Sequence, residues 1–126
     1  MNDCVGEHCN YKEERPGGSF EHLLDTDYCK VKRIIVKPDQ RLSYQYHHER
    51  TEHWVIVQGD AVVTLNDEEY LFTEGMVVEI PVGTKHRVEN KFEKNLIFIE
   101  TQTGTYFGED DIVRIEDDYG RDSNEN

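Results

Sequence analysis

The sequence contains little cysteine and no long apolar run. Its three cysteines, Cys4, Cys9 and Cys29, are an odd number and lack the spacing of a disulfide framework. The N-terminus does not show the charged and then apolar pattern of a signal peptide. No apolar stretch approaches the roughly 20 residues that are needed to cross a bilayer. We therefore expect a reduced, cytoplasmic protein without a membrane partner.

Positive charge is also scarce. The chain has 14 Lys and Arg residues against 27 Asp and Glu residues, and its formal net charge is -13. A field of this sign repels phosphate backbones and anionic lipids, and no basic run is present to overcome it. We expect no nucleic-acid partner. A phosphorylated small molecule would have to be held by a metal and by individually placed Lys or Arg side chains.

Helical periodicity is nearly absent. Short runs rich in Val, Ile, Tyr and Phe alternate instead with Gly, Pro and Asn turns, a pattern typical of a closed β structure, either a sandwich or a jelly-roll barrel. A chain of 126 residues fits a single domain. We expect an all-β domain at residues 15–121, with flexible tails at residues 1–14 and 122–126.

Two stretches carry potential metal ligands. The first runs from Gln45 to Gly59 in the order Q-x-H-x4-E-x6-G, and the second runs from Gly75 to Asn90 in the order G-x5-P-x-G-x2-H-x3-N. The potential ligands in these stretches are Gln45, His47, Glu52 and His86. Two imidazole nitrogens and two oxygens suit zinc and its neighbours, and the bound ion could polarise a substrate oxygen or activate a water. The alternative is a buried polar cluster in which the His and Glu side chains satisfy each other.

Strand parity predicts which side chains face the metal. Residues 42–47 and 52–58 read as strands, and Gln45 and His47 point to one side of the first because side chains alternate. If Glu52 faces the same interior, Trp54 and Ile56 share its face and give the metal an apolar floor. By the same parity, His53 points away.

The two stretches resemble the two motifs of the cupin family. Gln45 stands where the first His of the usual His-x-His pair is found, and Asp39 stands where a leading Gly is expected. Gln in that place, followed by Arg50, Glu52 and Trp54, resembles more specifically the type II phosphomannose isomerase domain. That domain usually forms the C-terminal part of bifunctional mannose-1-phosphate guanylyltransferase/mannose-6-phosphate isomerases. The similarity covers most of the chain and includes Arg15-Pro16, Ile80 to Arg87, Gly108 to Arg114 and Glu116 to Arg121.

The resemblance implies a cupin double-stranded β-helix, which is a jelly-roll barrel, with a divalent metal. Zn is the first expectation, with Mn, Co, Ni and Fe as alternatives. The implied reaction interconverts mannose 6-phosphate and fructose 6-phosphate, and moves a proton between C1 and C2 through a cis-enediol. Negative charge then develops on the carbonyl oxygen of the substrate, where a metal can stabilise it.

Several basic residues are candidates for contact with the sugar phosphate. Arg50 is expected on the loop between the two ligand-bearing strands, and Lys85 adjoins His86. Arg114 and Arg121 come next, because Arg suits bidentate contacts with phosphate. For each of these residues, an exposed salt bridge is the alternative role.

The base that transfers the proton is harder to identify. His53 is a candidate because imidazole titrates in the required range, although parity turns it away from the metal. Packing or a hydrogen bond to the backbone is its alternative role. A metal-bound hydroxide, Lys85 or an acidic residue of the run from Glu109 to Asp111 are the other candidates.

Two departures from the family leave other functions open. Gly17 stands where the family usually has Trp, and the sequence shows neither a guanylyltransferase region nor a Gly-rich nucleotide loop. The domain could isomerise alone, act beside a separate guanylyltransferase, or act on another sugar phosphate or sugar nucleotide. A non-catalytic sugar-binding cupin that keeps the metal is a further alternative, whereas an iron dioxygenase is disfavoured by Gln45. We also expect a homodimer, since cupin barrels often pair through their sheet edges.

Overall fold

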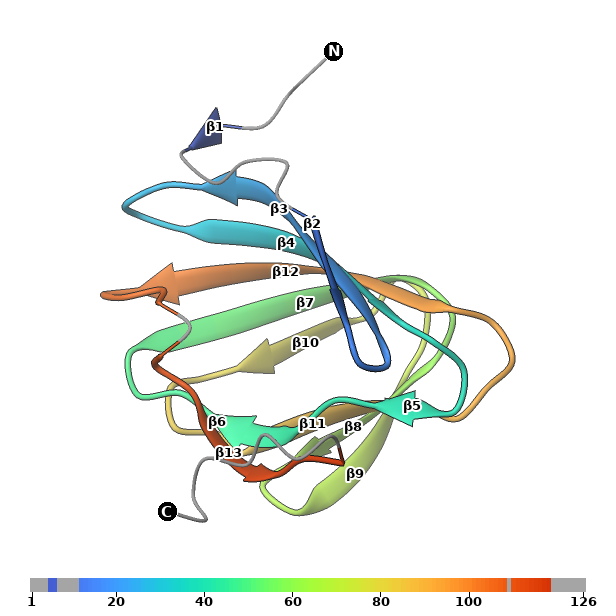
Figure 1. Ribbon diagram of the computed structural model, residues 1–126. Coiled ribbons are helices and arrows are strands. Elements are labelled where there is room, and N and C mark those ends of the chain that lie inside the picture. Colours follow the sequence, from blue (N-terminus) through green and yellow to red (C-terminus); the bar gives the residue numbers. More distant parts are fainter. Residues whose placement is uncertain (1–4, 7–11, 109, 119–126) are drawn as a thin grey trace.

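Two β-sheets stacked one above the other form the domain (Figure 1). The computed structural model describes residues 5–6, 12–108 and 110–118, and in these ranges every regular element is a strand. Within them there is no helix of the length and apolarity required to traverse a membrane. The larger sheet contains, in spatial order, β1 (Val5–Gly6), β3 (Gly18–Asp25), β4 (Lys30–Val36), β12 (Leu96–Gly104), β7 (Arg50–Gln58) and β10 (Val77–Ile80), with β2 (Lys12–Arg15) paired to β3.

The smaller sheet closes the other side of the interior. Its spatial order is β13 (Val113–Glu116), β6 (Tyr44–Tyr46), β11 (His86–Asn90), β8 (Ala61–Leu65) and β9 (Glu68–Phe72), with β5 (Gln40–Arg41) paired to β11. Strands from distant parts of the chain lie side by side, and β12 is placed between β4 and β7. Among the described strands, every pairing except that of β1 with β3 is antiparallel. The expected all-β jelly roll is therefore confirmed.

The first strands lie in the segment expected to be a flexible tail. Residues 12–15 of β2 pair with residues 18–21 of β3 in a hairpin. No apolar pattern marks this strand, because its pairing uses main-chain groups and its polar side chains alternate only between exposed and half-buried positions. The ordered domain therefore begins at least three residues earlier than expected. Residues 122–126, the expected C-terminal tail, lie outside the described residues.

Two positions that differ from the family pattern, Gly17 and Asp39, lie at turns with a left-handed backbone. Gly17 has a φ of 86° and Asp39 a φ of 63°. Gly adopts this conformation without strain, and Asp tolerates it better than most residues. Gly17 therefore suits the tight turn of the β2–β3 hairpin, whereas a bulky aromatic residue would be strained there. Asn66 and Asp67 form another turn of left-handed backbone, with φ values of 47° and 72°.

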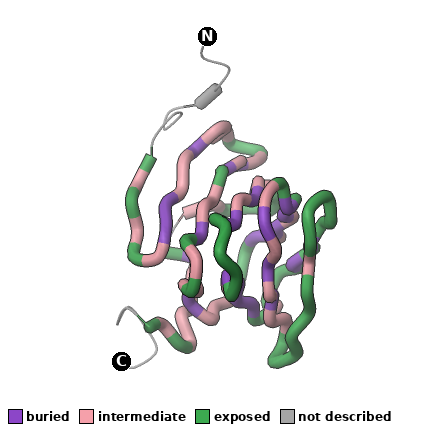
Figure 2. Tube along the Cα trace, turned by 90° about the vertical axis from the view of Figure 1, so that its right-hand side faces the viewer, coloured by how far each residue is buried: buried purple, intermediate pink, exposed green. Residues whose placement is uncertain are grey.

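Apolar side chains from both sheets fill the interior. Figure 2 shows buried stretches alternating with partly exposed ones along the strands. Trp54 and Ile56 are buried on β7, as parity predicted. Among the residues that the structure describes, the buried apolar core consists of Val36, Trp54, Ile56, Ala61, Val63, Val78, Ile80, Val88, Leu96 and Phe98.

The inner face of the larger sheet changes from apolar to polar along its strands. Cross-strand register produces three rows of neighbours, and the first contains Phe20, Ile34, Phe98 and Ile56. The second row contains His22, Lys32, Glu100 and Trp54, and the third contains Lys30, Gln102 and Glu52. One end of the interior is thus an apolar core, and the other end holds charged and amide groups that can carry chemistry.

Candidate metal centre

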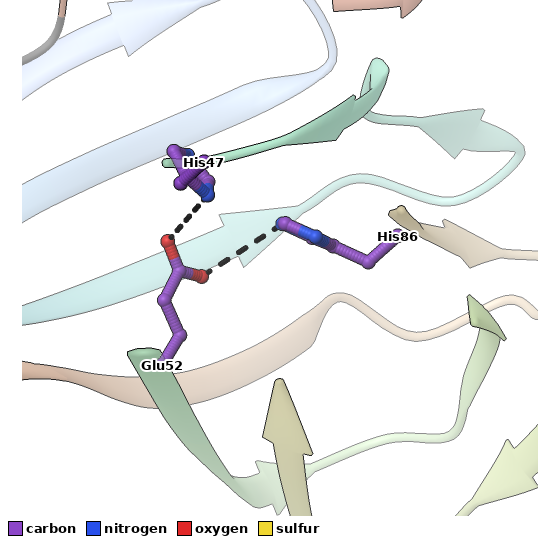
Figure 3. Close-up of side chains that lie close together, drawn as sticks. All are labelled: His47, Glu52 and His86. Atoms are coloured by element: carbon purple, nitrogen blue, oxygen red, sulfur yellow. Dashed lines mark ion pairs between the residues drawn. The ribbon is translucent and has the colours of Figure 1, made fainter. Parts of the chain in front are cut away.

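Three of the predicted ligands meet at the polar end of the interior (Figure 3). His47 follows β6, Glu52 lies on β7 and His86 begins β11. The Glu52 carboxylate lies between the two imidazoles, with Oε2 3.5 Å from His47 Nδ1 and Oε1 4.0 Å from His86 Nε2. All three side chains are buried, and their ligand atoms lie within 4.8 Å of one another. The sequence spacing therefore identified a real cluster.

Gln45 lies beside this cluster. It pairs in register with His86 across β6 and β11, and both residues line the same cavity. Its Oε1 accepts a hydrogen bond from the Ser43 hydroxyl at 3.2 Å. Gln45 is half-buried, whereas the three clustered residues are fully enclosed. Its role as a fourth ligand stays a prediction.

The His86 ring presents one nitrogen to the cluster. Its Nδ1 lies 2.9 Å from the carbonyl oxygen of Thr84, which fixes the proton on Nδ1 and leaves a lone pair on Nε2. Nε2 is buried and has no hydrogen-bond partner among the described residues. Burial lowers the pKa of His86, so the ring is neutral at physiological pH. A buried imidazole nitrogen of this kind fits a metal ligand.

Arg50 lies inside the cluster and not on a loop. It is the first residue of β7, its side chain is buried, and it enters the interior because it precedes Glu52 by two residues on the same strand. Its Nε donates a hydrogen bond to Glu52 Oε2 at 3.0 Å, and its Nη2 donates one to His47 Nε2 at 2.9 Å. The expected loop position was wrong because β7 begins two residues earlier than the apolar pattern indicated. The expected proximity to the ligands is nevertheless found.

The protonation states suit metal binding. Burial lowers the pKa of His47 to about 4; the charge of Glu52 opposes this shift and that of Arg50 adds to it. Burial alone would raise the pKa of Glu52, but His86, Arg50 and His47 lower it to about 2. At neutral pH the carboxylate is therefore ionised and both imidazoles are neutral, as metal coordination requires.

Trp54 contacts two of the candidate ligands. Its indole Nε1 donates a hydrogen bond to Glu52 Oε1 at 3.0 Å. Its ring meets the edge of His86 at a centroid distance of 5.8 Å and stacks on Phe98 at 4.6 Å. Trp54 thus forms the expected apolar floor and also orients Glu52, a contact that the sequence did not indicate. Partners of this type fix the direction of metal ligands.

The donor set fits a divalent ion. Two neutral imidazoles and one ionised carboxylate are ligands that Zn²⁺, Mn²⁺, Co²⁺, Ni²⁺ and Fe²⁺ accept. The buried Nε2 of His86 lacks a hydrogen-bond partner among the described residues, and an ion would satisfy it. The cluster of His47, Glu52 and His86 is therefore a candidate metal centre.

A cavity extends from this cluster over the inner face of the larger sheet. Glu52, His86 and Gln45 form part of its wall, together with the buried carboxyl group of Glu100 on β12. Five basic residues also line it: Arg15, Lys32, Arg50, Arg87 and Arg114. The cavity therefore connects the candidate metal centre with both acidic and basic groups.

Glu100 is a functional candidate that the sequence interpretation missed. Burial, and after it the negative charge of Glu52, raise the pKa of its carboxyl group to about 7, although Lys32 and Arg50 oppose the shift. Gln102 Nε2 donates a hydrogen bond to Glu100 Oε2 at 2.5 Å. The sequence did contain a signal. Glu100 and Gln102 follow Leu96 and Phe98 at every second position of one strand, so all four side chains point inward.

His53 and Lys85 lie away from the cavity. His53 is on the outer face of β7, where its side chain is 43% exposed and its Nε2 lies 3.7 Å from Glu79 Oε2. The parity prediction for His53 is confirmed, and its candidacy as the base is not supported. Lys85 is exposed and absent from the described residues that line the cavity. Lys85 points outward because His86, its neighbour in the chain, points inward and neighbouring side chains alternate.

The remaining candidates belong to the C-terminal segment. Arg114 on β13 is half-buried, pairs in register with Gln45 and lines the cavity, as a substrate contact requires. Asp110 accepts a hydrogen bond from the Tyr106 hydroxyl. Asp111 accepts hydrogen bonds from the backbone N–H groups of residues 48 and 49, and so supports the loop before Arg50. Glu109 and Arg121 lie outside the described residues.

Comparison with known proteins gives a consistent relationship over the whole domain. The family model described as "Mannose-6-phosphate isomerase C-terminal" matches residues 3–117. The xanthan biosynthesis protein XanB of Xanthomonas campestris pv. campestris (strain B100) is 49% identical over 110 residues, which are 87% of this chain and 24% of that protein. A mannose-1-phosphate guanylyltransferase of Salmonella montevideo is 46% identical over 116 residues, which are 91% of this chain and 25% of that protein. The chain thus spans about a quarter of the length of these relatives.

Solved structures agree with the fold. The capsular polysaccharide assembling protein CapF of Staphylococcus aureus is similar with a TM-score of 0.74 and 28% identity, over 83% of this chain and 31% of that chain. A conserved protein of Klebsiella pneumoniae with a double-stranded β-helix domain has a TM-score of 0.72 and 17% identity, over 82% of this chain and 84% of that chain. The second likeness concerns the fold alone.

Proposed function

Because the chain belongs to the family of mannose-6-phosphate isomerase C-terminal domains, we propose that it is a metal-dependent isomerase of mannose 6-phosphate and fructose 6-phosphate. The observation that supports this most is the buried cluster of His47, Glu52 and His86, which opens on a cavity lined by basic side chains and a second carboxyl group. A metal, a proton acceptor and cations for the phosphate are the groups that this reaction needs.

His47, Glu52 and His86 would hold the ion, and we propose Gln45 as the fourth ligand. When bound there, a divalent ion supplies positive charge next to the oxygens on C1 and C2 of the sugar. Arg50 keeps Glu52 ionised and accepts no proton itself, since its guanidinium remains charged at all physiological pH values. Its hydrogen bond to His47 Nε2 also holds that ring in one orientation.

We propose Glu100, in place of His53, as the group that moves the proton. Its carboxylate would take the proton from C2 of mannose 6-phosphate and return it to C1 of the enediol. The hydroxyl proton of O2 passes to O1, and the product is fructose 6-phosphate. The carboxyl group lies on the cavity wall, and Gln102 holds it there. A pKa near 7 supports this role, because both protonation states are populated at neutral pH.

Arg50 and Arg114 are the proposed contacts for the substrate. Both line the cavity, and Arg114 approaches it from β13 in the opposite sheet. Arg50 already serves the ligand cluster, so we assign it to the sugar end of the substrate. Arg121 remains a proposal from the resemblance alone.

A non-catalytic sugar-binding cupin is the second candidate function, and one observation favours it. The guanidinium of Arg50 hydrogen-bonds to both Glu52 and His47, so the cluster has a balancing positive charge from the chain itself. A cluster of that kind could have a structural role at the base of a sugar-binding cavity. Glu100 would then have no catalytic role.

We also propose two partners. The relatives are about four times as long as this chain, and one of them is a mannose-1-phosphate guanylyltransferase. A separate guanylyltransferase is therefore the proposed protein partner of this domain. A homodimer formed through sheet edges is the proposed assembly, because pairing would cover exposed edge strands.

A coupled assay tests the proposed function. Purified protein is loaded with Zn²⁺, Mn²⁺, Co²⁺, Ni²⁺ or Fe²⁺, and fructose 6-phosphate formed from mannose 6-phosphate is measured. Elemental analysis of the same samples reports the bound metal. We expect turnover with at least one ion. A protein that carries the ion and binds the sugar phosphate without turnover would instead be the sugar-binding cupin.

A further inference from the structure

The charged residues of the cavity wall are mainly basic, whereas those of the whole chain are mainly acidic. The wall contains five basic and two acidic residues, whereas the whole chain has 14 basic and 27 acidic residues. More than a third of all cations in the protein therefore line one cavity. Enclosed charge of one sign concentrates the local field and selects ligands of the opposite sign. The cavity suits an anion although the protein as a whole repels one.

Two of these cations, Arg50 and Arg87, form hydrogen bonds with other groups of the chain. Arg50 is hydrogen-bonded to Glu52 and His47. Arg87 donates from Nε to the carbonyl oxygen of Leu42 and from Nη1 to Glu116 Oε1, both at 2.9 Å, and thereby ties β11 to the β5–β6 segment and to β13. Arg15 and Lys32, which also line the cavity, have acidic neighbours of their own: Arg15 forms an ion pair with Glu13, and Lys32 lies opposite Glu100 across β4 and β12.

Arg15 and Lys32 converge on a single aromatic ring. The Arg15 guanidinium carbon lies 5.0 Å from the centroid of the Phe20 ring, and the Lys32 ammonium nitrogen lies 4.6 Å from it. Both distances are within the range of cation–π contacts. Lys32 is only 5% exposed, and Glu100 is its cross-strand neighbour on β12. An anion bound between these two cations would be attracted by both of them.

The backbone fixes this arrangement before any ligand arrives. The β2–β3 hairpin that carries Arg15 packs directly on β4, because a Cβ atom at Gly18 would lie 1.8 Å from the carbonyl oxygen of Ile35. The N–H of Lys37 donates to the carbonyl oxygen of Gly17 at 2.8 Å and closes the same contact. Lys32 projects from the middle of β4. A site of this kind loses little entropy when it binds its ligand.

We infer that Arg15 and Lys32, held against the Phe20 ring, form a binding site for a phosphate monoester. The position agrees with a sugar phosphate that reaches the candidate metal centre. Lys32 on β4 is separated from Glu52 on β7 by β12, so the two strands are about 10 Å apart at the usual strand spacing. That span is comparable with an extended hexose 6-phosphate. The orientation of the sugar rests on the proposed function, whereas the affinity for the phosphate group does not.

Binding measurements on the full chain test the site without relying on activity. Protein depleted of metal and dialysed free of chelator is titrated calorimetrically with fructose 6-phosphate, inorganic phosphate and fructose. The variants are Lys32→Gln and Arg15→Gln, and the matched control is Arg33→Gln. Arg33 follows Lys32 on β4 and is exposed, so the control removes the same charge from the opposite face.

We expect fructose 6-phosphate to bind much more tightly than fructose. Lys32→Gln and Arg15→Gln should each weaken binding of fructose 6-phosphate by about tenfold or more, as the loss of a charged hydrogen bond predicts. Arg33→Gln should leave it unchanged. Lys32→Arg keeps the charge and should retain most of the affinity, which separates loss of the contact from loss of folding. Equal affinities for fructose 6-phosphate and inorganic phosphate would support the site and identify free phosphate as sufficient.

Two results would overturn the inference. One is wild-type affinity for fructose 6-phosphate in Lys32→Gln. The other is a loss of affinity in Arg33→Gln equal to that in Lys32→Gln, because binding would then depend only on the net charge of the protein. The isomerase proposal fails separately. Binding through Lys32 without turnover would refute the isomerase and keep the phosphate site. Turnover with an unchanged KM in Lys32→Gln would refute the phosphate site and keep the isomerase.

Discussion

Arg50 and Glu52 lie two residues apart on β7, and both side chains enter the interior, where Arg50 Nε donates a hydrogen bond to Glu52 Oε2 at 3.0 Å. The pair occupies the centre of the candidate metal site. A buried carboxylate is costly without a positive partner, and Arg50 supplies that partner from the same strand. A bound metal would therefore share Glu52 with a charge that the chain already provides.

Replacement of Glu52 by Gln should remove the bound ion and destabilise the fold. The variant leaves Arg50 buried without its carboxylate partner, and breaking a buried pair costs about 3–5 kcal/mol. Elemental analysis and urea denaturation measure the two effects. The control is Glu79→Gln, which makes the same change at an exposed position of β10. Wild-type metal content in Glu52→Gln would contradict the assignment of the ligand.

Replacement of Arg50 by Gln should strengthen the response to metal. Without Arg50, the ion no longer competes with a guanidinium for Glu52 and His47. We expect the metal-free variant to unfold at a lower temperature than the wild type. The increase in Tm on addition of Zn²⁺ should be larger in the variant, because tighter binding to the native state gives greater stabilisation. An equal or smaller increase would show that Arg50 and the ion do not compete.

Replacement of Glu100 by Gln should abolish proton transfer without affecting the metal. Loss of a general base typically reduces kcat by about 10²- to 10⁴-fold, and we expect a decrease in that range with unchanged metal content. His53→Gln is the matched control, because it removes a titratable group from the outer face of the neighbouring strand β7. A variant of Glu100 with wild-type kcat would exclude the proposed role, and a low kcat in His53→Gln would restore the earlier candidate.

The same substitution should change how stability depends on pH. The pKa of Glu100 is raised from 4.5 to about 7, first by burial and then by the charge of Glu52. Between these two values the folded state keeps a proton that the unfolded state releases, so this group makes the wild type less stable as pH rises. Relative to the wild type, Glu100→Gln should gain stability from pH 4.5 to 7 and then level off, with a gain of up to about 3 kcal/mol. Urea denaturation at pH 5, 6, 7 and 8 measures the difference, and a constant difference would contradict the raised pKa.

Local spacing predicted much of the candidate metal centre. His47, Glu52 and His86 were found as a cluster, and the outward position of His53 followed from parity. The position of Arg50 was wrong in detail, since the polar start of β7 gave no strand signal. Glu100 was missed because it lies on β12, outside both stretches with potential metal ligands, although its inward direction follows from alternation along that strand.

The sequence by itself determined the all-β class, the three candidate ligands that cluster, and the sides of β7 to which Glu52, His53 and Trp54 point. These properties depend on the two-residue alternation of a strand, which is local. The tertiary structure decided what faces what: that Glu100 is the cross-strand neighbour of Lys32, and that Arg15 meets Lys32 at the Phe20 ring. Those contacts join strands that are distant in the chain, and their register is set by the packing of the whole interior. A local pattern therefore predicts which residues point inward, and only the fold determines their neighbours.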